Sequence, residues 1–117
     1  MNILIVDDSR VMRMIVHRAL RQTGLQIDEV YEACDGREGL AISKDKMPDW
    51  ILCDWNMPKM NGIEMLRALR GEGNVTPFGF VTSQSAPEVR AEAREAGAQF
   101  LITKPFTPEA FLRALSA

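Results

Sequence analysis

The sequence predicts an α/β protein, a doubly wound parallel sheet covered by helices on both faces. Short apolar runs alternate about five times with segments whose apolar residues recur at helical spacing. This repetition is typical of parallel strands joined by crossover helices. The first, third and fifth runs show little polar alternation, as expected for strands buried on both faces. No linker or low-complexity segment interrupts the pattern, so residues 1–117 are predicted to form one domain.

The predicted elements follow one another without long gaps. The strands are expected at Asn2–Val6, Ile27–Ala33, Trp50–Cys53, Phe78–Val81 and Gln99–Thr103. The helices are expected at Ser9–Thr23, Asp35–Lys46, Asn61–Arg70, Ala86–Ala96 and Thr107–Leu115.

The first and fourth predicted helices differ in how much apolar surface they offer the sheet. The first has one apolar stripe, formed by Val11, Met12, Ile15, Val16, Ala19 and Leu20. Its other side is rich in arginine and also carries Met14 and His17. The fourth offers only Val89 and alanines, so it should bury little area and be weakly anchored.

Helix ends carry recognisable signals. Either Asp8 or Ser9 suits the cap of the first helix. Ser85–Glu88 matches a capping box with proline just inside the fourth helix, and Thr107–Glu109 starts the fifth in a similar way. Glycines suited to ending helices stand at positions 24, 71 and 97.

Composition excludes several classes of function. A formal charge of −2 provides no broad basic surface for direct nucleic-acid binding. No apolar run approaches the roughly 20 residues of a membrane span, and the first residues lack a secretory signal, so a cytoplasmic protein is expected. Cys34 and Cys53 have neither metal-type nor redox-type spacing and should be buried free thiols.

Polar residues follow several predicted strands directly. Asp7 and Asp8 come after the first strand, Asp54 after the third, and Thr82 and Lys104 at the ends of the fourth and fifth. In open α/β sheets, ligands bind at the carboxyl ends of the strands. Taken singly, Asp8 could be a helix cap, Asp54 a loop residue and Lys104 a solvated lysine. Their convergence at one sheet edge favours a functional site.

The chemistry of such a site follows from its charges. Two carboxylates about 5 Å apart at an effective dielectric near 20 repel by roughly 3 kcal/mol, which a divalent cation relieves. Mg²⁺ suits a site with few carboxylates, several waters and a phosphate. A carboxylate can also attack phosphorus to give an aspartyl phosphate. Lys104 would then supply a cation, and Thr82 a hydroxyl donor, for the added negative charge.

These residues resemble a known family. The motifs are Asp7-Asp8-Ser9, the segment Asp54–Gly62, the pair Thr82-Ser83 and Lys104-Pro105-Phe106. In order and spacing they resemble the response-regulator receiver domains of two-component systems, most of all single-domain chemotaxis regulators of the CheY type. The resemblance covers essentially the whole chain.

The resemblance implies a (βα)5 flavodoxin-like fold with strand order 2-1-3-4-5. It implies that Asp54 is the phosphoacceptor and that Mg²⁺ is held by Asp7, Asp8, Asp54 and the backbone carbonyl of Asn56. Thr82 and Lys104 would contact the phosphoryl group and couple it to a switch. It also implies a cis Lys104–Pro105 bond. Because strand one separates strands two and three in this order, Cys34 and Cys53 should be too far apart for a disulfide.

Two positions depart from the family pattern. Leu101 stands where relatives often carry tyrosine or phenylalanine, and the neighbouring Phe100 should face the other side of the strand. Gly79 interrupts the fourth strand, where it either weakens the strand or permits a close approach. Neither departure touches the phosphorylation chemistry, but both affect the expected output switch.

The leading hypothesis is therefore a regulator that assists its own phosphorylation and dephosphorylation, rather than an enzyme. Its phosphoryl donor would be a sensor histidine kinase or a histidine phosphotransfer protein, whose docking surface could be the arginine-rich face of the first helix. A downstream protein would bind the face of the fourth and fifth helices, and the regulator itself is expected to be a monomer. His17 lies on that arginine-rich face and is expected to be solvated rather than a donor.

Three alternatives remain at this point. The chain could be the receiver of a longer regulator with an output domain. It could be a Mg²⁺-dependent aspartyl-phosphate phosphatase, although Asn56 stands where a second acid would serve the leaving group. It could also be a receiver that binds without turning over phosphate, although none of the acids, Thr82 or Lys104 is missing.

Overall fold

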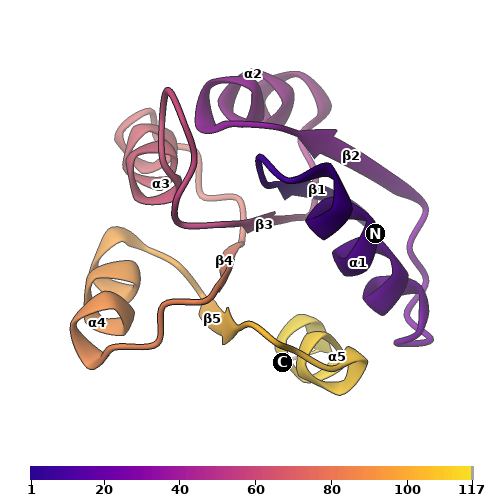
Figure 1. Cartoon of the computed structure of the whole chain (residues 1–117). Helices are drawn as coiled ribbons and strands as arrows, with labels where there is room; N and C mark the ends of the chain where they lie inside the picture. The colour runs from indigo at the N-terminus through magenta and orange to yellow at the C-terminus, as the bar shows by residue number, and fades with distance from the viewer. Residues whose placement is uncertain (117) are drawn as a thin grey trace.

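The computed structural model describes residues 1–116, which form five parallel strands and five helices in strict alternation. The strands are β1 (Asn2–Val6), β2 (Glu29–Ala33), β3 (Trp50–Cys53), β4 (Phe78–Thr82) and β5 (Phe100–Thr103). The helices are α1 (Arg10–Arg21), α2 (Gly36–Lys46), α3 (Gly62–Gly71), α4 (Pro87–Ala96) and α5 (Pro108–Ser116). The sheet order is β2-β1-β3-β4-β5, which confirms the predicted fold (Figure 1).

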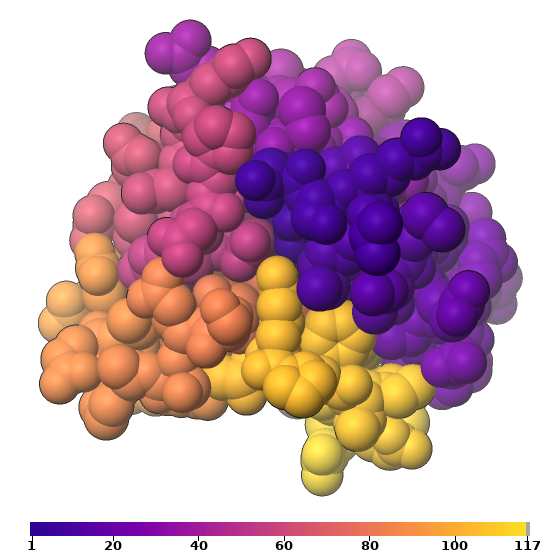
Figure 2. Space-filling model, viewed as in Figure 1, coloured from indigo at the N-terminus to yellow at the C-terminus, as the bar shows by residue number. Residues whose placement is uncertain are grey.

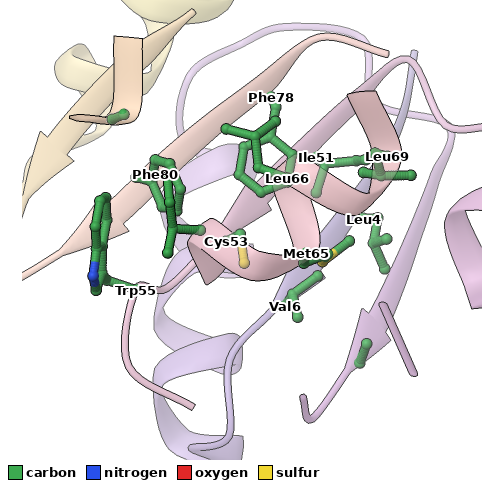
Figure 3. Packing of buried hydrophobic residues seen from close by; sticks show 13 residues of the cluster. Leu4, Val6, Ile51, Cys53, Trp55, Met65, Leu66, Leu69, Phe78 and Phe80 are labelled. Atoms are coloured by element: carbon green, nitrogen blue, oxygen red, sulfur yellow. The ribbon is translucent and has the colours of Figure 1, made fainter. Parts of the chain in front are cut away.

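The helices form two layers around the sheet. In Figure 1, α1 and α5 lie together on one side, and α2, α3 and α4 line the other. Each layer closes one apolar cluster. Residues of β1, β3 and β4 alternate between the two clusters, because successive side chains of a strand point to opposite faces. On the α3 side, the aromatic rings of Trp55, Phe80 and Phe78 follow one another in a row (Figure 3).

Most element ends agree with the sequence patterns, with two exceptions at the beginnings of β2 and α4. β2 begins at Glu29, two residues later than predicted, although the Asp28 N–H still donates to the Met1 carbonyl beside β1. The Ser85 capping box is wrong: α4 is capped by Ala86, with no side-chain hydrogen bond. Ser9, by contrast, caps α1 and accepts the Met12 N–H. Gly97 ends α4 in the left-handed conformation that glycine favours.

The buried stripe of α1 is narrower than predicted. Val16, Ala19 and Leu20 are buried, whereas Val11 and Ile15 are 65% and 45% exposed. The buried positions are spaced as one helical face that packs on β1 and α5, and positions 11 and 15 lie beside that face. An apolar strip of α1 therefore remains at the surface, and Met14 belongs to it.

Gly79 permits a close approach. The Phe100 ring lies where a Gly79 side chain would stand, and it also packs 5.4 Å from the Trp50 ring, centre to centre. Leu101 packs against the cluster on the opposite face, which confirms that Phe100 does not replace it.

Both cysteines are free, as predicted, and Cys53 is buried. The predicted burial of Cys34 is wrong, because this residue lies exposed just after β2. None of the helices within residues 1–116 is long and apolar enough to cross a bilayer.

Candidate functional site

The site forms where four neighbouring strands end. Asp7 follows β1, Asp54 follows β3, Thr82 is the last residue of β4, and Lys104 follows β5. Val6 pairs with Cys53 in the sheet register, so Asp7 and Asp54 leave adjacent strands at the same level. Figure 2 shows the consequence: the indigo N-terminal segment, the rose middle segment, the orange β4–α4 region and the gold β5–α5 region meet near the centre of this face.

Three carboxylates converge at this edge. Asp7, Asp8 and Asp54 each offer an oxygen, and these oxygens lie within 4.8 Å of one another. Their surroundings differ, because Asp7 is 4% exposed, the Asp54 side chain is 14% exposed, and Asp8 is open to solvent. Asp54 is therefore partly shielded yet still reachable from outside.

Lys104 joins two of these acids. Its Nζ lies 3.3 Å from Asp7 Oδ2 and 3.6 Å from Asp54 Oδ2. The lysine is held in place by its backbone, since its N–H donates to the Thr82 carbonyl at 2.8 Å. The following Lys104–Pro105 peptide bond is cis, as predicted.

The surroundings of Asp54 shift its protonation. Burial is the main factor that raises the pKa of Asp54 above its usual value, and the neighbouring Asp7 carboxylate raises it further. The Lys104 ammonium and the N–H of Trp55, which donates to Asp54 Oδ1 at 2.7 Å, act in the opposite direction. The site therefore holds the negative charge of Asp54 at some cost, which a further cation would relieve.

Thr82 and Asn56, the other two predicted site residues, differ in exposure. Thr82 is 1% exposed, and its hydroxyl oxygen accepts the Gln84 N–H at 3.2 Å. Asn56 is exposed, two residues after Asp54, in the loop between β3 and α3. Their roles toward a phosphoryl group or a metal stay predictions.

The loop that carries Asp54 is closed tightly. The Gly62 N–H donates to the Trp55 carbonyl at 2.9 Å. A Cβ at position 62 would collide with the Asp54 carbonyl and the Phe80 ring. Only glycine fits there, so the beginning of α3 packs directly beneath the Asp54 backbone.

Arg13 also belongs to the site, although the sequence pattern places it with the solvated arginines of α1. Its Nη1 donates to the Asp7 carbonyl at 2.6 Å, and its Nε donates to Glu32 Oε1 at 2.8 Å. The side chain is only 15% exposed. Helical spacing gives the face on which a residue lies, but not that a loop carbonyl lies above it, so the sequence carried no signal for this contact.

The residues present fit Mg²⁺. Asp7, Asp8 and Asp54 supply hard carboxylate oxygens from two adjacent loops, and Asp8 is open to water. Mg²⁺ is usually held by few carboxylates while it keeps several waters, so a half-open cluster of this kind suits it. The raised pKa of Asp54 points the same way, because a bound cation would favour the ionised carboxylate.

Known proteins resemble this chain along almost all of its length. CheY-3 of Vibrio cholerae serotype O1 is 39% identical over 109 residues, which cover 92% of this chain and 82% of that protein. CheY of Pseudomonas aeruginosa is 38% identical over 111 residues, covering 93% and 88%. The structure of V. cholerae CheY4 matches with a TM-score of 0.85 at 38% identity, covering 98% of this chain and 95% of that one.

The model of the response regulator receiver domain family matches residues 3–116, the segment that contains every strand end described above. Family, fold and the arrangement of acids and lysine agree. The chain belongs to the response regulator receiver domains and resembles the CheY chemotaxis proteins of two-component signalling.

Proposed function

We propose that Asp54 accepts a phosphoryl group from a phosphohistidine, in a Mg²⁺-dependent reaction that this domain assists. The observation that carries the proposal is the position of the Asp54 carboxylate, which is 14% exposed, lies 3.6 Å from the Lys104 ammonium and has oxygens of Asp7 and Asp8 within 4.8 Å. A nucleophile must be both ionised and reachable, and partial exposure beside a lysine meets both conditions.

The transfer needs few protein groups. One Asp54 carboxylate oxygen forms a bond to phosphorus while the N–P bond of the phosphohistidine breaks, and the leaving imidazole takes up a proton. Lys104 would neutralise an oxygen of the phosphoryl group, since its flexible chain already brings the ammonium within 3.6 Å of Asp54 Oδ2. Thr82 would rotate its hydroxyl to donate to another.

Mg²⁺ would be held by Asp7, Asp8, Asp54 and the carbonyl of Asn56. When bound, it would offset the negative charge that accumulates as a dianionic group approaches three carboxylates. Asp7 would serve both cations, because its Oδ2 already lies 3.3 Å from the Lys104 ammonium.

The phosphoryl donor would be a sensor histidine kinase or a histidine phosphotransfer protein. A downstream protein would recognise the phosphorylated form, and we propose that it binds the face formed by α4, β5 and α5. An open groove of about 500 Å³ lies along β5 and α5, with Leu101, Phe106 and Arg113 among its lining residues. Thr103 and Pro105, the chain neighbours of Lys104, also line this groove, so a movement of Lys104 towards a phosphoryl group would move residues of the groove.

Mass spectrometry after treatment with acetyl phosphate tests the chemistry. The wild-type protein should gain one phosphoryl group with Mg²⁺ and none in EDTA. Asp54→Asn should gain none, whereas Asp45→Asn, which removes an exposed carboxylate from α2, should behave as the wild type. A full phosphoryl equivalent on Asp54→Asn would refute the assignment. Release of inorganic phosphate from many phosphate esters would instead indicate a phosphatase.

A further inference from the structure

Beside the acids lies a contact that the phosphorylation chemistry does not use. Arg13 of α1 reaches back to the loop between β1 and α1, where its Nη1 donates to the Asp7 carbonyl at 2.6 Å. Its Nε donates to Glu32 Oε1 on β2 at 2.8 Å. One planar guanidinium thus joins a helix, a strand and the acidic loop.

The bonded carbonyl belongs to the peptide unit between Asp7 and Asp8. A planar peptide fixes the direction in which the next residue leaves, so a donor on this oxygen sets where the Asp8 side chain begins. Asp7 is already restrained by other bonds: its N–H donates to the Ala33 carbonyl at 3.0 Å, and its Oδ1 accepts the Ser9 N–H at 2.9 Å. Asp8, by contrast, is exposed to solvent.

Glu32 orients the Arg13 guanidinium, which in turn holds the loop between β1 and α1. Glu32 immediately precedes Ala33, whose carbonyl receives the Asp7 N–H. The strand therefore holds Asp7 by its backbone and, through Glu32 and Arg13, by the carbonyl as well. Groups that orient metal ligands without touching the metal typically change metal affinity by about 10–100-fold when removed.

We infer that Arg13, oriented by Glu32, is a positioning residue that sets the Asp7–Asp8 peptide for Mg²⁺ binding. The inference rests on the proposed function, because it assumes that these acids bind Mg²⁺. Electrostatics alone predicts the opposite effect of removing Arg13. Loss of a positive charge near the acids should strengthen cation binding, whereas loss of a positioning bond should weaken it.

The test is a Mg²⁺ titration without phosphodonor, followed by tryptophan fluorescence and calorimetry. Arg13→Gln should raise the Kd of Mg²⁺ about tenfold. Arg18→Gln is the matched control, since Arg18 is an exposed arginine of the same helix. It loses the same charge and should leave the Kd unchanged or slightly lower. An Arg13→Gln protein that binds Mg²⁺ as tightly as the wild type, or more tightly, overturns the inference.

Three further measurements separate positioning from stability. Arg13→Lys keeps the charge but not the planar pair of donors, so its Kd for Mg²⁺ should still rise. This variant replaces Arg13→Gln in the test if Arg13→Gln does not fold.

Adding Glu32→Gln to Arg13→Gln should weaken Mg²⁺ binding no further, because Glu32 acts through Arg13. Additive losses of affinity would contradict this. With acetyl phosphate, Arg13→Gln should need more Mg²⁺ for half-maximal phosphorylation but reach the wild-type rate at saturation, and a rate that stays low would refute positioning.

The outcomes also separate this inference from the proposed function. If the wild-type protein binds no Mg²⁺, both fail. If the wild type binds Mg²⁺ and Arg13→Gln binds it equally well, only the role of Arg13 fails.

Discussion

Asp54 carries a carboxylate whose surroundings oppose its charge. Its pKa is raised, first by burial and then by Asp7, and Lys104 compensates only in part. The folded protein therefore binds the Asp54 proton more tightly than the unfolded chain does. Above this raised pKa, the ionised group lowers the free energy of unfolding, and the penalty disappears as the pH falls through the pKa.

Asp54→Asn should consequently stabilise the metal-free protein. In EDTA, its Tm should exceed that of the wild type by a few degrees at about pH 8, and the difference should shrink towards about pH 4 as the wild-type carboxyl becomes protonated. Mg²⁺ should raise the Tm of the wild type and leave that of Asp54→Asn almost unchanged. Thermal melts at several pH values measure this, with Asp45→Asn as control. A Tm below that of the wild type at every pH would contradict the argument.

Among the helices, α4 is held unequally at its two ends. Its first turn has no side-chain cap, and only Ala93 of its residues is buried. At its other end, Arg70 of α3 donates to the Gly97 carbonyl at 2.8 Å and to the Thr76 carbonyl at 2.9 Å. In the first turn, the side-chain bond to the neighbouring strand is a long one, from Arg90 to the Leu101 carbonyl at 3.4 Å. The helix is therefore held more firmly where it ends than where it begins, a few residues after Thr82 in the chain.

Phosphorylation should therefore be read out mainly through α4. Hydrogen exchange measured with and without acetyl phosphate should change chiefly in Ser83–Ala96, most of all near the beginning of the helix, with little change at Leu101. Leu101→Tyr should leave phosphorylation of Asp54 intact but alter the affinity for a downstream partner, because it adds an aromatic ring and a hydroxyl to the groove beside α5. A strong response of β5 with a silent α4 would show that the switch runs through the strand instead.

At the scale of the whole molecule, the surface beside the acidic site is apolar and basic. Val11, Met14 and Ile15 of α1 are 65%, 57% and 45% exposed, and the exposed Arg18 and Arg21 follow them along the helix. A donor protein must bring its phosphohistidine to Asp54, so it has to contact the surface beside the carboxyl ends of the strands, where α1 begins. Arg13 is not part of that surface, because its guanidinium is engaged inside the protein.

Charge reversal at Arg18 and Arg21 should slow phosphotransfer from a histidine donor several-fold, since charge complementarity mainly sets the rate of association. The reaction with acetyl phosphate, which needs no docking, should keep its rate. Arg94→Glu on α4 is a control for charge alone, since Arg94 is exposed and lies on another helix. Equal slowing of both reactions by the Arg18 and Arg21 variants would instead indicate damage to the site.

The sequence predicted the parts of this molecule that depend on local patterns. The α/β class followed from apolar runs alternating with helical segments, and the site edge from polar residues directly after those runs. The strand order and the cis Lys104–Pro105 bond followed from the family resemblance instead. What it could not predict depends on tertiary contacts. Four arginines of α1 look alike in sequence, yet only the position of the Asp7 carbonyl distinguishes Arg13. Likewise, Ser85 matches a cap, but the chain enters α4 through Ala86.

The pairing of Gly79 with Phe100 constrains how this sequence can vary. The ring of one residue fills the side-chain volume that the other lacks, on neighbouring strands in direct register. Side-chain size at the two positions should therefore covary among relatives. Relatives with a branched residue at the position of Gly79 should carry glycine or another small residue at the position of Phe100. Enlarging position 79 alone would open the sheet, and removing the ring alone would leave a void beside Trp50. Each change is tolerated only together with the other, so substitutions at positions 79 and 100 should occur in pairs.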